Sequence, residues 1–436
     1  MAEPTIDWDA WTEQATDWLS KFIRVDTVNP PGNEARACEW LGRILDAEGI
    51  PYETVDPGNG RTSLIARLAG DGSRGKALIL LNHTDVVPFE RDQWTVDPMG
   101  GEVRDGYVWG RGALDMKSQG IMELISFLIH HRMGLPLTRD LIFMAVADEE
   151  AGSTYGIEFL DREHPELLDC EYVINEGGGG STEALGVERN TINIGVSEKG
   201  PVWLTLRARG RPGHGSVPHD DNAADHLVRV LGRVLAWKRP YIITPEVQEY
   251  FDQLHAAGIL DRAPTRAVLV ELAENNPRLK SILMNSISLT MLTAGVKHNV
   301  IPAMAEATLD CRLVPGYDAE KFIDELTRVI ADPRVEIERV FVASTPTTST
   351  HTELYEVMVR ESKRVLEDVL VLPSVSSGFT DSRVFRRRGV ASYGFVPTLT
   401  GPSDQGRVHG NDERISIENL RIGTQIMHQV VRGICG

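Results

Sequence analysis

Several side chains that can bind a metal ion follow apolar segments of this chain. His83 and Asp85 follow the apolar run 77–81 after a single asparagine, and Asp115 lies in the glycine-rich segment 110–117. Further carboxylate and imidazole groups occupy comparable positions: Asp148, Glu149, Glu150, Glu176 and His409. Two histidines with several carboxylates suit a pair of divalent cations. The sequence therefore favours a metal-dependent hydrolase.

His83 and Asp85 are two residues apart, so on an extended segment their side chains project to the same side. Asp85 could then accept a hydrogen bond from the second ring nitrogen of His83 and orient that ring for a metal. A strand end capped by polar residues has the same pattern. Asp115 also has a structural alternative, because it precedes an expected helix and could be its N-cap.

Two adjacent glutamates, Glu149 and Glu150, follow the apolar run 141–146. Close like charges repel each other unless a cation compensates them. If Glu150 binds a metal, Glu149 points elsewhere and can act as a general base toward a water. The alternative is a solvated acidic turn. The glycines 177–180 lack the pattern of a phosphate-binding loop, so a nucleotide site is not expected there.

Composition narrows the possible classes of protein. The 436 residues allow two or three domains, and 42% hydrophobic residues predict a sizeable core. The formal charge of −18 argues against a nucleic-acid partner. No apolar run is long enough for a membrane helix, and the first residues lack the regions of a signal peptide. The four cysteines are far apart and form no CxxC motif, which favours free thiols and a cytoplasmic location.

Strands and helices alternate over the first part of the chain. Apolar spacing predicts helices over 8–23, 35–48 and 118–132 and strands over 63–68, 77–81, 141–146 and 172–174. Near-continuous apolar strands between helices indicate an α/β sheet that is covered on both faces.

The pattern changes after residue 198. Strands are predicted over 202–208, 287–292, 305–313 and 335–342, with helices over 222–237 and 319–330. The order βαββαβ is that of a ferredoxin-like unit, with 241–281 as a mostly helical insertion. We therefore predict a catalytic domain in two parts, 1–198 and 346–436, interrupted by an inserted domain, 199–345.

These motifs resemble those of the zinc aminoacylase and carboxypeptidase family, peptidase family M20, from about residue 15 to the C-terminus. The resemblance rests on His83-x-Asp85, Gly110 to Lys117, Glu149-Glu150, Glu176-Gly177, Gly210 to Ser216, Asn299 to Pro302, Asp310-Cys311-Arg312 and His409. It implies an α/β, dizinc exopeptidase-like catalytic domain with a mixed central sheet. The inserted ferredoxin-like domain would act as a lid and dimerisation domain.

The resemblance also implies two zinc ions per subunit, bridged by Asp115. His83 and Glu176 would complete one site, and Glu150 and His409 the other. Cobalt or manganese fits ligands of these types as well.

Three catalytic residues are implied: Glu149 as general base, Asp85, and His214, which would stabilise the oxyanion across a dimer. The implied substrate-binding residues are Asn299, Arg312 and Gly378. A planar guanidinium suits recognition of the substrate's carboxylate, although Arg312 could equally form a surface salt bridge. Phe379 replaces a smaller residue of several relatives, which leaves the size of the pocket open.

Glutamate at position 176, in place of aspartate, resembles the deacylase branch of the family. We therefore expect hydrolysis of the amide bond of N-acyl-L-amino acids, with a carboxypeptidase or dipeptidase as the alternative. The expected partners are an N-acyl amino acid or short peptide with a free carboxylate, and a second copy of this chain as a homodimer. Neither nucleic acid nor a membrane is expected as a partner.

Overall fold

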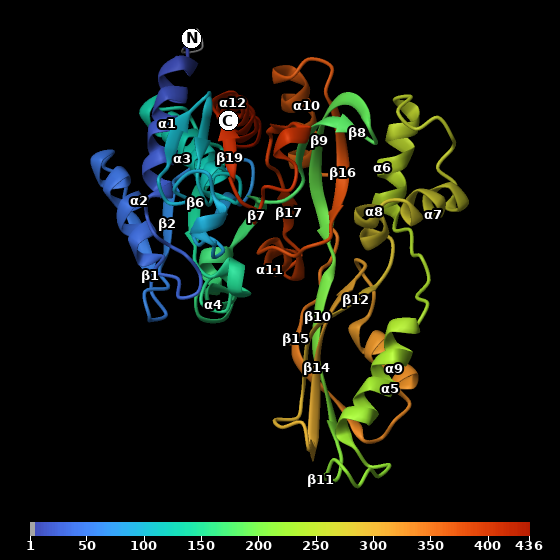
Figure 1. Cartoon of the computed structure of the whole chain (residues 1–436). Coiled ribbons are helices and arrows are strands. Elements are labelled where there is room, and N and C mark those ends of the chain that lie inside the picture. The colour runs from blue at the N-terminus through green and yellow to red at the C-terminus, as the bar shows by residue number, and fades with distance from the viewer. Residues whose placement is uncertain (1–4) are drawn as a thin grey trace. The chain divides into compact units, whose positions relative to one another are not determined.

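The computed structural model describes residues 5–436 and divides into two compact units (Figure 1). The first unit contains the chain up to Val196, Thr348–Ser374 and Thr380–Gly436, and the second contains Ser197–Thr347 and Val375–Phe379. Residues 1–4, on which the expectation of no signal peptide partly rests, lie outside the described residues. The domain boundaries expected at residues 198 and 345 stay predictions.

A ten-stranded sheet forms the centre of the first unit. Its strands are β1 (Tyr52–Val55), β2 (Ser63–Leu68), β3 (Ala77–His83), β6 (Leu141–Val146), β7 (Cys170–Asn175), β8 (Gly179–Ala184), β9 (Val187–Glu198), β16 (Leu370–Ser376), β17 (Ala391–Gly394) and β18 (Leu399–Thr400). The order is β1-β2-β6-β3-β7-β17-β9-β8-β18, and β16 pairs with β9. Because β3 is parallel to β6 and β7 whereas β2 is antiparallel to β6, the expectation of a mixed central sheet is confirmed.

Helices cover both faces of this sheet. They are α1 (Trp8–Ile23), α2 (Ala35–Ala47), α3 (Lys117–Arg132), α4 (Ile157–Glu163), α10 (Glu353–Val365), α11 (Ser382–Arg387) and α12 (Ile417–Cys435). Alternate residues of β3 enter different cores. Leu78 and Leu80 pack in the core that contains α1, α3 and α12, whereas Ile79 and Leu81 pack in the core that contains α4 and α11. The predicted sheet with two covered faces is confirmed.

A small sheet in the same unit joins two distant parts of the chain. Its strands are β4 (Glu102–Arg104), β5 (Tyr107–Trp109) and β19 (Arg414–Ser416), in the order β19-β5-β4. The antiparallel pairing of β19 with β5 brings the segment after His409 beside the segment before Asp115.

The second unit has the predicted ferredoxin-like order. Its elements are β10 (Gly200–Arg209), β11 (Gly213–His214), α5 (Ala223–Ala236), α6 (Pro245–Ala256), α7 (Arg266–Glu274), α8 (Pro277–Ile282), β12 (Ser286–Ala294), β13 (Val300–Ile301), β14 (Met304–Leu313), α9 (Ala319–Ile330) and β15 (Val335–Val342). The antiparallel sheet has the order β12-β14-β10-β15. Helices α5 and α9 lie along this sheet (Figure 1), and their apolar residues belong to its hydrophobic core. Helices α6 to α8 form the predicted helical insertion.

Among residues 5–436, no helix is long and apolar enough to cross a membrane. Cys38, Cys170, Cys311 and Cys435 are all buried and free.

Two imidazoles lie against each other in the core of the first unit. The ring centroids of His130 on α3 and His428 on α12 are 4.9 Å apart, and Trp8 packs edge-on against His428. Neither ring nitrogen of His428 has a hydrogen-bond partner among the described residues. Burial, with the nearby His130, lowers the pKa of His428 to about 3. The folded chain therefore keeps this imidazole neutral.

We expect this pair to make the fold sensitive to acid. The unfolded chain protonates His428 near its usual pKa of about 6.5, so its contribution to stability is present above that pH and is lost as the pH falls toward 3. The free energy of unfolding, measured in urea, should fall between pH 6.5 and pH 5. We expect this fall to be roughly 2 kcal/mol smaller in His428→Met than in the wild type. The exposed His351 provides a control, because His351→Asn should follow the wild type. Equal pH slopes for all three proteins would contradict the assignment.

Candidate metal centre

Three parallel strands end at the edge of the sheet where the candidate ligands gather. His83 is the last residue of β3, the single turn η2 (Glu149–Ala151) follows β6, and Glu176 directly follows β7. The pairing of β3 with both β6 and β7 is parallel, so the carboxyl ends of all three strands lie at one edge. Crevices outside the carboxyl ends of strands are the usual ligand sites of open α/β sheets.

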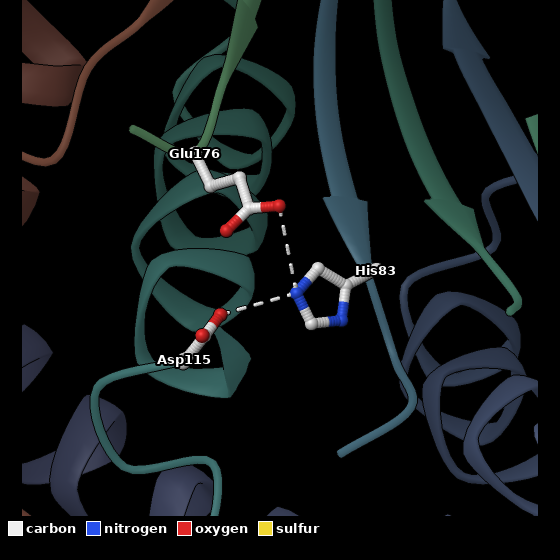
Figure 2. Close-up of side chains that lie close together, drawn as sticks. All are labelled: His83, Asp115 and Glu176. Carbon is white, nitrogen blue, oxygen red and sulfur yellow. Dashed lines mark hydrogen bonds and ion pairs between the residues drawn. The ribbon is translucent and has the colours of Figure 1, made fainter. Parts of the chain in front are cut away.

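The first group of candidate ligands is His83, Asp115 and Glu176 (Figure 2). The Nε2 atom of His83 lies 3.2 Å from Oδ1 of Asp115 and 3.7 Å from Oε1 of Glu176. Figure 2 shows both carboxylates pointing toward this nitrogen. One imidazole and two carboxylates that converge on one point form a donor set that Zn²⁺ accepts.

The second group is Asp115, Glu150 and His409. Nε2 of His409 lies 2.9 Å from Oδ2 of Asp115 and 3.2 Å from Oε1 of Glu150. The two oxygens of Asp115 therefore face different imidazoles, with Oδ1 toward His83. In each group the ligand atoms lie within 4.8 Å of one another. This geometry fits two cations that share Asp115.

The charges of these groups also fit cations. Neighbouring carboxylates raise the pKa of His409 to about 10. Burial, together with Asp115, raises the pKa of Glu176 to about 8. Several buried carboxylates close together contribute to both shifts, and such a concentration of negative charge favours bound protons or cations. Because metal ligands must be deprotonated, bound cations would replace these protons.

The main chain at Asp115 is held by a buried ion pair that the sequence analysis did not identify. Glu413 accepts hydrogen bonds from the main-chain N–H groups of Leu114 (2.6 Å) and Asp115 (3.0 Å). Its other oxygen accepts from Arg111 at 2.6 Å, and Arg111 also donates to the main-chain oxygen of His409 at 3.4 Å. The pair thus links the shared ligand to the histidine of the second group.

Replacing Glu413 should loosen the centre. Glu413→Gln leaves the guanidinium of Arg111, which is only 2% exposed, without its counter-charge, and losing one partner of a buried pair typically destabilises a fold by about 3–5 kcal/mol. We also expect zinc affinity to fall about 10–100-fold, as for other outer partners of metal ligands. Denaturant unfolding and zinc titration measure the two effects, with the exposed Glu418→Gln as control. Wild-type zinc affinity in Glu413→Gln would show that the pair supports folding alone.

Asp85 is fully buried and holds the turn that carries both glutamates. Its Oδ1 accepts from the main-chain N–H of Glu149 at 3.2 Å, and its Oδ2 accepts from that of Glu150 at 3.1 Å. Nδ1 of His83 lies closer to the main-chain oxygen of Asp85, at 3.0 Å, than to its carboxylate, at 3.4 Å. The expected contact with the carboxylate is therefore the longer of the two. Burial favours a higher pKa of Asp85, but the hydrogen bonds from His83 and Asn29 hold that pKa below its usual value.

Glu149 lies beside the ligands but belongs to neither group. Its side chain is buried, and this burial raises the pKa of the carboxyl well above the usual range, with the charge of Glu176 adding to the effect. A carboxyl with raised proton affinity next to a metal site has the properties of a proton acceptor.

The remaining predicted residues belong to the second unit. Strands β11 and β13 pair His214 with Val300, and the N–H of Gly215 donates to the main-chain oxygen of Asn299 at 2.9 Å. His214 and Asn299 are thus neighbours. The N–H of Ser216 donates to Nδ1 of His214 at 3.1 Å, which leaves Nε2 to carry the proton of the neutral ring.

Arg312 and Gly378 lie elsewhere in this unit. The guanidinium of Arg312 is paired with Asp310 (2.7 Å) and lies 5.0 Å from the ring centroid of Phe379. Phe379 packs edge-on against Trp203 and so lies on the sheet. The N–H of Gly378 donates to Oγ of Ser376 at 3.2 Å. Arg312 would therefore have to share its charge between Asp310 and a substrate carboxylate.

Comparison with known families agrees with this site. A family model described as Peptidase family M20/M25/M40 matches residues 79–433, most of the chain. The chain belongs to this family. It is therefore a metal-dependent amidohydrolase or peptidase.

Individual relatives cover nearly the whole chain. N-fatty-acyl-amino acid synthase/hydrolase PM20D1 of Xenopus tropicalis is 29% identical, over 96% of this chain and 86% of that protein. Aminoacylase-1 of Sus scrofa is 28% identical, over 95% and 93%. Two solved structures share the fold: an M20 family metallo-carboxypeptidase from Sulfolobus solfataricus (TM-score 0.76, 17% identity, 97% of this chain and 99% of that one) and human carnosine dipeptidase 1 (TM-score 0.68, 16% identity, 98% and 97%).

Proposed function

We propose that this M20 hydrolase cleaves the amide bond of N-acyl-L-amino acids with two zinc ions at the candidate centre. The observation that carries the proposal is the shared carboxylate. Asp115 faces His83 with one oxygen and His409 with the other, and each pair has a further glutamate beside it. Cobalt or manganese would fit the same donors.

In the proposed reaction, Glu149, Asp85 and His214 have different roles. When bound, a pair of cations supplies Lewis-acid polarisation of the carbonyl and acidifies a water. Glu149 accepts a proton from the attacking water and then gives it to the leaving amide nitrogen. Asp85 accepts hydrogen bonds from the main-chain N–H groups of Glu149 and Glu150 and so positions the backbone from which both side chains project. His214 donates from Nε2 to the oxyanion.

The choice of substrate rests on the relatives and on Glu176. Aminoacylase-1 and the N-fatty-acyl-amino acid synthase/hydrolase are named for N-acyl amino acids, and both match almost the full chain. Glutamate at position 176 resembles the deacylase branch. The alternative is a carboxypeptidase or dipeptidase. The two structural neighbours carry those names, but at 17% and 16% identity their likeness supports the shared fold alone.

A paired substrate panel tests this proposal. Zinc-loaded enzyme is offered N-acyl amino acids of rising acyl length beside unblocked dipeptides, and released amino acid is measured. Cleavage of the N-acyl set supports the deacylase. Cleavage of dipeptides alone would instead place the chain among the peptidases with the same metal chemistry.

We further propose a homodimer in which His214 acts on the partner's substrate. His214 lies at the Met304 end of β14, whereas Arg312 lies at the other end, which is roughly 26 Å away at about 3.3 Å per residue. The carboxylate and the scissile amide of an N-acyl amino acid are only a few bonds apart. With Arg312 at the substrate carboxylate, His214 of the same chain would lie too far from the scissile amide, and this supports the proposed trans role.

Exposed apolar side chains support a dimer interface on this unit. Met291 and Leu292 of the edge strand β12 are 62% and 55% exposed, and Val228 and Leu235 of α5 are also exposed.

Mixing His214→Ala with Glu149→Gln subunits should restore part of the activity if the residues act in trans. No recovery in mixed dimers verified by mass would contradict the proposal.

We also propose a cytoplasmic location, in keeping with the four buried free thiols.

A further inference from the structure

The turn from Asn29 to Glu34 connects to the candidate centre through a buried arginine. The Asn-Pro-Pro-Gly-Asn-Glu sequence lies between α1 and α2. Its first and last residues both contact Arg61. Nη1 of Arg61 donates to Oε1 of Glu34 at 2.7 Å, and Nη2 donates to Oδ1 of Asn29 at 2.9 Å. The side chain of Arg61 is 9% exposed and that of Glu34 is fully buried. This contact makes the turn part of the buried structure around the site.

The guanidinium fixes which way the amide of Asn29 points. Arginine has donors and no acceptor, so the oxygen of the amide must face Arg61 and its NH₂ group must face away. Nδ2 accordingly donates to Oδ2 of Asp85 at 2.7 Å and to Oδ1 of Asp148 at 3.2 Å. Asp85 is the carboxylate that holds the N–H groups of Glu149 and Glu150.

Asp148 is held from several sides in an uncommon backbone conformation. Its φ of 68° lies in the left-handed region, which persists in a residue other than glycine when surrounding contacts fix it. Its N–H donates to Oε1 of Glu34 at 3.2 Å, and its carboxylate lies 3.3 Å from Nη1 of Arg61. The N–H of Tyr155 donates to the other oxygen at 2.9 Å. This residue determines the direction in which the chain enters Glu149 and Glu150.

We propose that Arg61 is a positioning residue of the metal centre, acting through Asn29 and Glu34 on Asp85 and Asp148. It sets the orientation of the turn from which Glu149 and Glu150 project. The inference rests on the proposed function, in which Glu149 is the base and Glu150 a ligand. Arg61 belongs to neither group of candidate ligands, so any effect on the centre must pass through its partners.

The planar fork of arginine is needed for this role. One guanidinium reaches Glu34, Asn29 and Asp148, whereas a lysine ammonium is a compact point charge that cannot span them in the same geometry. A Cβ on Gly32 would lie 2.3 Å from Nη1, so the turn also leaves space for this group.

Arg61→Lys tests the inference because it keeps the buried charge and removes the fork. Zinc is titrated into the metal-free protein in competition with a chromophoric chelator, and His409→Ala identifies the step that belongs to the Glu150 and His409 site. We expect that step to weaken about 10–100-fold, while the step of His83 and Glu176 changes little. On zinc-saturated enzyme, kcat should fall with KM unchanged. Arg67→Lys, an exposed arginine that pairs with Asp140, is the matched control and should behave as the wild type.

Asn29→Ala is the second variant, since it removes the amide and leaves the ion pair of Arg61 and Glu34 in place. It should weaken the same zinc step and lower kcat, and it decides the question if Arg61→Lys does not fold. Wild-type zinc affinities and wild-type kcat in either folded variant would overturn the positioning role. If the wild type itself fails to bind two zinc ions, the proposed function falls together with this inference.

Discussion

Glu149→Gln is expected to lower kcat by about 10²–10⁴-fold, the usual contribution of a general base, while the metal content stays at the wild-type level. Glutamine has the shape of glutamate but cannot accept the proton of the attacking water. Glu149 supplies no ligand atom to either metal group, so the substitution leaves both donor sets intact. Turnover of an N-acyl amino acid and metal analysis of the same preparation measure the two quantities.

Glu163→Gln is the control for this experiment. Glu163 is half-exposed and forms an ion pair with its neighbour Arg162, so its replacement should change neither turnover nor metal content. If Glu149→Gln keeps both its metal and near-wild-type turnover, another group accepts the proton and the assigned role of Glu149 is wrong.

The predicted ligands could be read from the sequence because each follows a recognisable local pattern. His83 and Glu176 directly follow or end strands with near-continuous apolar residues, and such strands pair in parallel with their carboxyl ends together. The structure gathers the five residues named from the sequence into two groups around Asp115. That these groups bind metal stays a prediction.

The partners that hold the ligands could not be predicted in the same way. Glu413 reaches Asp115 across 298 positions and Asn29 reaches Asp85 across 56, and a single hydrogen bond over such separations leaves no periodic pattern. The Pro-Pro-Gly sequence after Asn29 indicates a break between two helices and nothing about a metal site. Arg61 and Glu413 also stand in no recognisable local motif, so only the folded structure shows that they contact the site.

Strands without a clear alternation were also missed. The hairpin of β8 and β9 begins within the run of glycines 177–180, and the burial of β8 is intermediate along most of its length. Glycine is depleted in strands, and a half-buried polar segment has no period of two in hydrophobicity. Tertiary pairing with β17 and β18, from the last part of the chain, determines the structure there.

Asp115→Asn should remove both metal ions and with them the activity. Asp115 is the one residue common to the two groups, and its two oxygens face His83 and His409. An amide offers a single oxygen donor and no negative charge, so we expect zinc affinity at both sites to fall by more than the roughly 100-fold that losing an outer partner causes.

Glu176→Gln is the matched variant, because it changes a ligand of one group and not the ligand that both groups share. Because Glu176 belongs to the His83 group alone, its replacement should weaken one zinc step and leave the step of Glu150 and His409 intact. Zinc titration of the two variants side by side therefore tests whether the centre is dinuclear. Loss of a single step in Asp115→Asn would mean that this carboxylate serves one ion, and that the second group holds its cation without it.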